Sequence, residues 1–174
     1  MVCCLFPVIA SVPSDISTES VSMTLDNVYS DYAISKALRY LGRIEEAKTY
    51  EQRSLNYQKL FRRDIQFFAP KKKDGSFDEV FSPNVWGTDF CESSAWSNNF
   101  SVFHDIPGVI KLFGGEAEAK RRLDTIFSSQ PKYEVGRYGF EIHEMTEMAS
   151  INLGYFAISN QPSFYLPFVY AYLG

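Results

Sequence analysis

The chain has 174 residues and a net charge of −4, from 17 basic and 21 acidic side chains, and 45% of its residues are hydrophobic. This length and hydrophobic content fit one domain with a sizeable core and exclude wholesale disorder. No long basic stripe occurs, so nucleic acid is not an expected partner. Aromatic residues make up 16% of the chain, which favours stacking surfaces or a piece of a larger aromatic-rich interior.

The N-terminal stretch, residues 2–10, is apolar but short and lacks a basic region before it. It therefore predicts neither a signal peptide nor a membrane span, and residues 1–11 are left unassigned with no membrane partner expected. Three cysteines, Cys3, Cys4 and Cys91, match neither a metal-ligand spacing nor a disulfide framework. We expect Cys91 to be a small thiol that lines the core.

Apolar residues recur at helical spacing over residues 20–41 and again over residues 44–61. Gly42 suits the C-terminal cap of the first helix. The short link predicts that the two helices pack as an antiparallel hairpin. Over residues 62–88 the periodicity fails, and a long loop region with a short hairpin around Asp74-Gly75 is expected.

The second half of the chain predicts five more helices. They are expected over residues 93–103, 107–113, 116–127, 144–155 and 162–173. Gly114-Gly115 would end the second of these, and Pro162 suits the first position of the last. Asp105 is as well placed to cap the helix that follows it as to act in catalysis. The pattern predicts an all-α fold, with helical hairpins joined by long loops, over residues 12–174.

The segment 89–96 carries one carboxylate, Glu92, among small hydroxyl residues, with Trp96 four positions on. An acid beside an aromatic platform is what a site needs to protonate a glycosidic oxygen and hold a sugar ring. A surface glutamate is the plain alternative, and Trp96 could equally belong to the core. Phe90 and Ala95 nearby indicate a loop that is not freely solvated, in which desolvation would favour the protonated acid.

Two further polar clusters lie in apolar settings. His143 and Glu144 can start a helix, or can bind sugar hydroxyls. His143 and Glu147 would share a helix face and could hold a metal, but no third ligand is identifiable. Asn160 and Gln161 can cap the last helix, or can bracket a vicinal diol or offer oxygen ligands to calcium.

Four motifs occur in order: Glu92-Ser-Ser-Ala-Trp96, Phe103-His-Asp-Ile-Pro-Gly108, Gly139-Phe-Glu-Ile-His-Glu-Met-Thr-Glu-Met148 and Ser159-Asn-Gln-Pro162. Together with Glu19-Ser-Val-Ser near the start of the first helix, they resemble glycoside hydrolase family 92, the calcium-dependent α-mannosidases. The resemblance covers roughly residues 12–174.

The resemblance implies an inverting exo-α-mannosidase that acts on mannosides of N-glycans or mannans. Its large domain is an (α/α)6 toroid, of which this chain would be a fragment. Glu92 corresponds to the general acid, and His143 and Glu144 correspond to residues that contact the leaving sugar. Calcium would bind O2 and O3 of the mannose, with ligands that the resemblance does not assign in this chain. Full-length relatives are typically secreted or periplasmic.

Two departures from the family pattern matter. The later Gly-Asp-Glu-Asp-Asn-Gly-like segment, which supplies the catalytic base, has no counterpart here, and Tyr165 stands where many members have a histidine. We therefore expect the chain to be inactive alone and to have the missing remainder of the enzyme as a partner, with a mannose-containing glycan as substrate. The alternative is a tetratricopeptide-like interaction module, suggested by residues 37–50, although no second copy follows about 34 residues on.

Overall fold

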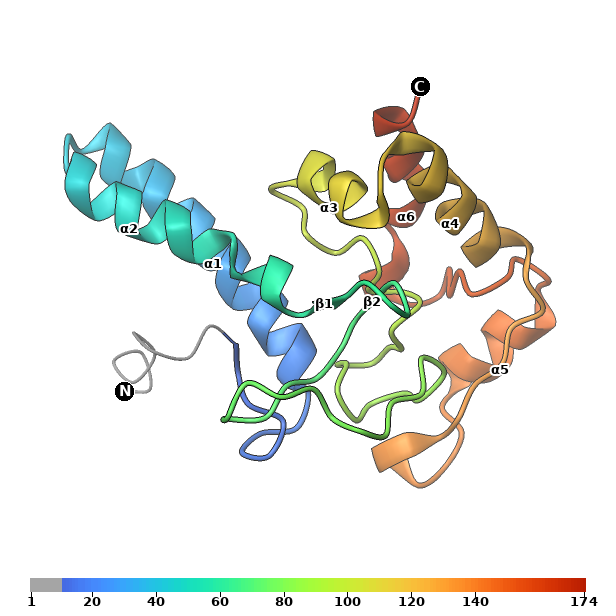
Figure 1. Ribbon diagram of the computed structural model, residues 1–174. Coiled ribbons are helices and arrows are strands. Elements are labelled where there is room, and N and C mark those ends of the chain that lie inside the picture. The colour runs from blue at the N-terminus through green and yellow to red at the C-terminus, as the bar shows by residue number, and fades with distance from the viewer. Residues whose placement is uncertain (1–10) are drawn as a thin grey trace.

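The computed structural model describes residues 11–174, so the interpretation of residues 2–10 lies outside the described part (Figure 1). This part is mainly helical, as predicted, and its strands form one two-stranded sheet. The α-helices are α1 (Ser20–Tyr40), α2 (Ile44–Ser54), α3 (Ile106–Phe113), α4 (Glu116–Ser128), α5 (His143–Ser150) and α6 (Leu166–Val169). Single 3-10 turns are η1 (Asn56–Lys59), η2 (Gly136–Tyr138), η3 (Gln161–Ser163) and η4 (Tyr170–Tyr172). In residues 11–174, no helix is long and apolar enough to cross a membrane.

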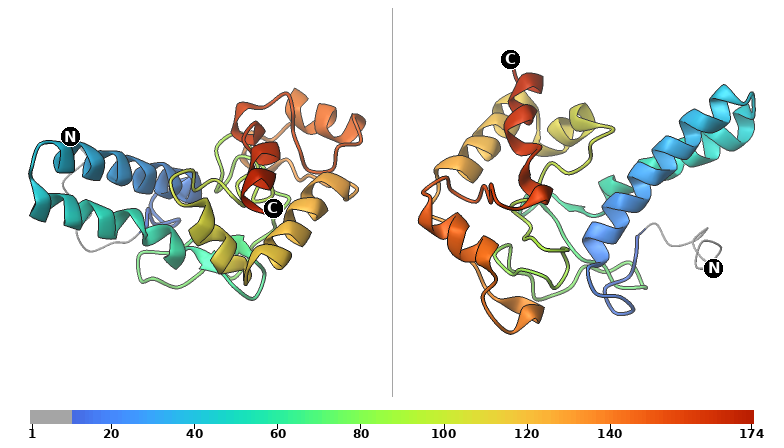
Figure 2. Two further views of the ribbon diagram at one scale, coloured as in Figure 1. Left: turned by 90° about the horizontal axis from the view of Figure 1, so that it is seen from above. Right: turned by 180° about the vertical axis from the view of Figure 1, so that it is seen from behind.

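The predicted hairpin is confirmed: α1 and α2 pack against each other and project away from the rest of the described chain (Figures 1 and 2). Gly42 lies in the turn between the two helices at φ 75°, a backbone conformation that residues with a side chain rarely adopt. Arg53 on α2 donates to Asp31 on α1 over 3.0 Å, and the Asp31 side chain is only 10% exposed. This ion pair joins the two helices at the end of α2, away from the turn of the hairpin.

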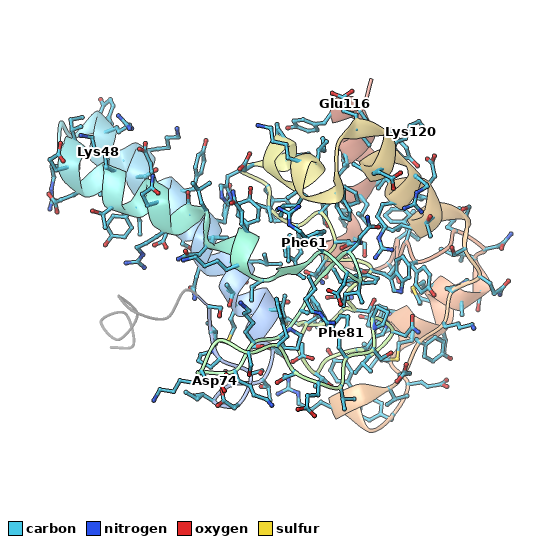
Figure 3. The ribbon with its side chains drawn as sticks, in the orientation of Figure 1. Lys48, Phe61, Asp74, Phe81, Glu116 and Lys120 are labelled. Carbon is cyan, nitrogen blue, oxygen red and sulfur yellow. The ribbon has the colours of Figure 1, made fainter. Side chains whose placement is uncertain are left out.

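The second helix is shorter than predicted, because the chain leaves the helical path after Ser54 to bring aromatic side chains into the core. Tyr57, in η1, is fully buried. β1 (Phe61–Arg62) then pairs antiparallel with β2 (Phe67–Phe68), with Phe61 opposite Phe68. Phe61, near the centre of Figure 3, meets the ring of Phe68 at 5.4 Å and that of Phe113 at 5.2 Å, both edge to face. Such aromatic pairs add to the burial of apolar area.

Residues 93–103 do not form the predicted helix; they run through successive turns. Their polar side chains bond the nearby backbone instead: Asn98 donates to the Ser94 carbonyl over 3.1 Å, and the Ser101 hydroxyl donates to the Asn98 carbonyl over 2.8 Å. Side chains of this kind compete with helical hydrogen bonds. The loop thus lies in the interior without regular structure, and Ser94 and Asn98 are buried.

The last two predicted helices are also shorter. α5 ends at Ser150, and the final segment breaks into η3, α6 and η4. Pro167, inside the predicted helix, explains the break, because a proline removes one backbone donor and crowds the preceding turn. These pieces pack beside α3 and α4 (Figure 1), through the buried side chains of Leu166 and Val169.

The start of α3 confirms the capping role considered for Asp105. Its Oδ1 accepts from the Gly108 amide over 2.9 Å, and its Oδ2 accepts from the Tyr57 hydroxyl over 2.7 Å. Burial of the phenol, followed by the bond to Asp105, raises the pKa of Tyr57. One carboxylate therefore caps a helix and satisfies a buried hydroxyl from a distant segment.

Replacing Asp105 with alanine is expected to lower the free energy of unfolding by about 1.5–5 kcal/mol, since a lost cap costs about 0.5–2 kcal/mol and an unpaired buried hydroxyl about 1–3 kcal/mol. Urea denaturation measures the change. Tyr57→Phe in the Asp105→Ala background should recover the second contribution. Equal stability of Asp105→Ala and the parent chain would show that neither contact matters.

Candidate active site

Glu92 occupies a strained backbone position. Its φ of 46° lies in the left-handed region, which costs energy for a residue other than glycine and which Glu19, Gln66 and Asn152 also adopt. The side-chain amide of Asn160 donates to the Glu92 carbonyl over 2.5 Å, and Asn160 is 1% exposed. Asn160 makes no capping bond to the turn that follows it. The motif around Glu92 and the Asn160-Gln161 motif therefore meet.

The η2 turn also contacts the loop that carries Glu92, through Tyr138 and Arg137. Gly87, at φ 70°, lies under the ring of Tyr138, and a Cβ added to this glycine would be 2.3 Å from the ring. The Tyr138 hydroxyl is buried without a hydrogen-bond partner, and burial raises the pKa of this phenol. Arg137 donates from Nε to the Gly87 carbonyl over 3.0 Å and pairs with Glu19, the residue before α1. Sequence analysis missed Tyr138 and Arg137, because no local pattern marks contacts across 50 residues.

The expectation that the loop withdraws Glu92 from solvent is wrong for this chain. Phe90 and Ala95 turn into the core, while Glu92 and Cys91 are exposed. The interpretation of Cys91 as a core thiol is wrong for the same reason. Partial burial and then the neighbouring charges of Glu19 and Glu92 raise the pKa of the Cys91 thiol. A thiol held neutral in this way is a poor nucleophile.

Another carboxyl group precedes Glu92 by three positions. Burial of Asp89, together with the like charge of Asp78, raises its pKa to about 6. The Asp89 backbone carbonyl accepts from the Val21 amide over 3.1 Å, which ties this part of the loop to the first turn of α1. The Cys91 amide adds a bond to the hydroxyl of Ser22 over 3.0 Å. The loop that carries Glu92 is thus anchored along the start of α1.

Trp96 is half-buried and has several protein contacts. Its Nε1 donates to Asn84 over 3.0 Å, and its ring stacks on Tyr155 with the centroids 4.2 Å apart. The guanidinium of Arg122 lies 4.4 Å from the ring centroid, and burial lowers the pKa of Arg122 to about 10. Phe67 meets the same ring edge to face at 4.9 Å. These contacts favour a packing role for Trp96, and its use as a sugar platform stays a prediction.

His143 begins α5 and is 68% exposed. Its Nε2 lies 3.3 Å from a Glu144 oxygen and its Nδ1 lies 3.4 Å from a Glu147 oxygen. Bonding to Ser159, and less strongly to His143, lowers the pKa of Glu147. Glu147, in the middle of α5, therefore lies near Ser159, whose neighbour Asn160 holds Glu92. Gln161 is exposed beside them.

Metal-binding groups are not gathered at this site. Within residues 11–174, no group of three or more histidine, cysteine, aspartate or glutamate side chains is placed to hold a metal ion. One oxygen stands out: Oδ1 of Asn160 is buried and has no hydrogen-bond partner. It is an oxygen donor of the type that calcium prefers, but one such ligand does not make a calcium site.

A shallow depression of about 490 Å³ lies elsewhere, lined by Phe61, Arg62, Arg63, Asp64, Phe77, Asp78 and Glu79. None of the six predicted site residues lines it. Arg62 and Asp64 on its wall pair with each other, so part of its charge is already compensated.

A chain whose regular structure is mostly helical, with one exposed glutamate in a loop held by a buried amide, fits part of a glycoside hydrolase catalytic domain. The chain belongs to glycosyl hydrolase family 92: the model of that family's catalytic domain matches residues 9–174. The helical-repeat alternative is not favoured.

Solved structures agree with this assignment. The family GH92 inverting mannosidase of Bacteroides thetaiotaomicron is 35% identical to the chain, with a TM-score of 0.79 over 95% of this chain and 22% of that one. A family GH92 α-mannosidase of the same organism is 27% identical, with a TM-score of 0.76 over 94% of this chain and 19% of that one.

A curated relative, an uncharacterized secreted glycosidase of Arthroderma benhamiae, is 29% identical over 91% of this chain and 20% of its own length. The chain thus spans about a fifth of the relatives it matches.

Proposed function

We propose that the chain is part of the (α/α)6 catalytic domain of an inverting exo-α-mannosidase that acts on mannose-containing glycans. The observation that carries the proposal is the backbone of Glu92, which is held at φ 46° with its carbonyl on Asn160 and its side chain exposed. A strained loop with several anchors is a way to present one acid at a fixed position. The similarity to the inverting mannosidase of Bacteroides thetaiotaomicron supports the substrate class.

In this proposal Glu92 is the general acid. It donates its proton to the glycosidic oxygen as the bond to the leaving sugar breaks. An inverting enzyme also needs a base, roughly 6.5–9.5 Å from the acid, which activates a water on the opposite face of the ring. We assign that base to a part of the relatives that this chain does not span. Packing against that part would also exclude water from Glu92.

The remaining residues are proposed to bind substrate. His143 and Glu144, at the start of α5, would contact hydroxyls of the leaving sugar, and Trp96 would support a sugar ring. Gln161 would bind a sugar hydroxyl beside Glu92. Asn160 donates from its amide nitrogen to the Glu92 carbonyl, and we propose that its Oδ1, which is buried without a partner in this chain, is the group that meets the substrate.

Calcium remains part of the proposal through the family resemblance alone. The residues described here do not supply a complete set of ligands, since no group of three or more histidine, cysteine, aspartate or glutamate side chains among residues 11–174 is placed to hold a metal ion. We therefore assign most of the calcium ligands to other segments of the enzyme, and no step of the reaction is derived through the ion.

A chimera tests the proposal. Residues 9–174 would replace the matching segment of the Bacteroides thetaiotaomicron inverting mannosidase, with which the chain is 35% identical. The chimera is expected to hydrolyse an aryl α-mannoside, while the 174-residue chain alone gives no rate above the blank. Clear hydrolysis by the isolated chain would contradict the assignment of the base to another segment, and a folded but inactive chimera would contradict the proposed function.

A further inference from the structure

The loop that carries Glu92 is closed at its base by a backbone hydrogen bond. The Gly87 amide donates to the Ser93 carbonyl over 3.3 Å, so residues 87–93 form a closed turn with Glu92 close to one end. Glu92 itself is held through its carbonyl by Asn160, with φ at 46°. A strained conformation of this kind persists only where the surrounding structure fixes it. The position of Glu92 therefore also depends on what holds the base of the loop.

Arg137, in the η2 turn, binds the base of this loop and the start of α1 with one guanidinium group. Its Nε donates to the Gly87 carbonyl over 3.0 Å. One terminal nitrogen donates to the Thr18 hydroxyl over 2.9 Å, and the other pairs with the Glu19 carboxylate. The backbone amide of Glu19 donates in turn to the Thr88 carbonyl over 2.7 Å. One side chain thus joins three segments that lie far apart in the sequence.

The three acceptors suit an arginine and no other side chain. A guanidinium group is planar, is always charged and presents its donors in a fixed fork, so three bonds in three directions hold its partners in one arrangement. A lysine at position 137 would keep the charge opposite Glu19, but its single ammonium group would not reproduce that fork.

The charge of Arg137 acts on the same neighbourhood. Burial, and then the charges of Glu19 and Glu92, raise the pKa of the Cys91 thiol, so both carboxylates lie near this thiol. Arg137 compensates one of these two like charges by pairing with Glu19. Without Arg137 the two carboxylates would repel each other with no cation between them, which would favour movement of the exposed Glu92 side chain.

We propose that Arg137 is a positioning residue for Glu92: it fixes the base of the 87–93 loop against the start of α1 and thereby sets where the carboxyl group of Glu92 meets the glycosidic oxygen. This inference rests on the proposed function and adds a residue to it. Arg137 acts through the loop and not on the substrate. Its side chain is 46% exposed, and an ion pair this open to solvent adds little to stability, so its removal should leave the chain folded.

The first test is amide hydrogen exchange on the full 174-residue chain. Arg137→Met keeps an unbranched side chain but removes every donor, and it is expected to speed exchange at Gly87 and its neighbours in the loop by about tenfold, through easier local opening. Exchange in α4 should not change. The matched control is Arg121→Met, which removes an exposed arginine and its ion pair with Glu118 from α4. Exchange over residues 87–93 that matches the parent chain would overturn the inference.

The second test uses the chimera described above. Arg137→Met is expected to lower kcat for an alkyl α-mannoside by about 10- to 100-fold with little change in KM, because a small misplacement of a catalytic group costs this much. Dinitrophenyl α-mannoside, whose leaving group needs no proton, should be slowed far less. Arg137→Lys should lose less than Arg137→Met, and Arg121→Met should keep the parent kcat with both substrates.

Two outcomes separate this inference from the proposed function. An active chimera in which Arg137→Met leaves kcat unchanged, or slows both substrates equally, overturns the positioning role alone. A folded parent chimera without activity overturns the proposed function, and the positioning role with it. Circular dichroism first confirms that each variant is folded, and if Arg137→Met is not, Arg137→Lys is judged by the same outcomes.

Discussion

Glu92→Gln in the chimera is expected to slow hydrolysis of an alkyl α-mannoside by about 10²- to 10⁴-fold, the usual contribution of a positioned general acid. Glutamine keeps the size of the side chain and its hydrogen-bonding capacity but has no proton to give to the leaving oxygen. The hydrogen bond that fixes this loop uses the backbone carbonyl of Glu92, so the substitution leaves it in place. The substitution should therefore lower kcat without unfolding the chimera.

Dependence on the leaving group makes this prediction specific. A dinitrophenolate leaves without protonation, so hydrolysis of dinitrophenyl α-mannoside should be slowed far less by Glu92→Gln than hydrolysis of the alkyl mannoside. Glu116→Gln, the same chemical change at an exposed position on α4, is the control and should keep nearly full activity with both substrates. An equal loss with both substrates would mean that Glu92 positions the substrate or the loop and is not the acid.

Local signals in the sequence were sufficient for α1, for the turn of the helical hairpin and for the start of α3, but not for the end of α2. The apolar spacing of α1, the glycine after it and the aspartate before α3 each act within one or two turns of helix, and the structure has all three. Pro167 has no backbone N–H to donate, so it predicts a break inside residues 162–173, although the apolar residues there recur at helical spacing.

The loop around Glu92 could not be predicted in this way. Its apolar residues suggested a helix after Glu92 and a buried acid, but buried serine and asparagine side chains bond the backbone and replace the helix. The side-chain contact on the Glu92 backbone comes from Asn160, 68 residues away, and Tyr138 packs on Gly87 of the same loop. Spacing along the chain carries no information about such contacts, and only the resemblance of ordered motifs placed Glu92 and Asn160 in one site.

The isolated chain is also expected to self-associate through its C-terminal segment. Phe164, Phe168 and Tyr172 are 50%, 74% and 52% exposed, on successive turns of the segment that packs beside α3 and α4. Fully burying such a side chain is worth about 1.5–3 kcal/mol, and a patch of several favours association. In our proposal, other helices of the toroid cover this face in the whole enzyme.

Sedimentation at increasing concentration should therefore detect oligomers of the chain, and a dye that reports exposed apolar surface should fluoresce with it. The double variant Phe164→Ser, Phe168→Ser should reduce both signals, because it removes two rings without touching the buried Leu166 and Val169. Val80→Ser is the control, since Val80 is 90% exposed but lies in a distant loop. A dye-silent monomer that melts cooperatively at about 45–65 °C, as typical mesophilic domains do, would show that this face needs no cover, and the proposal that residues 12–174 are one part of a toroid would have to be given up.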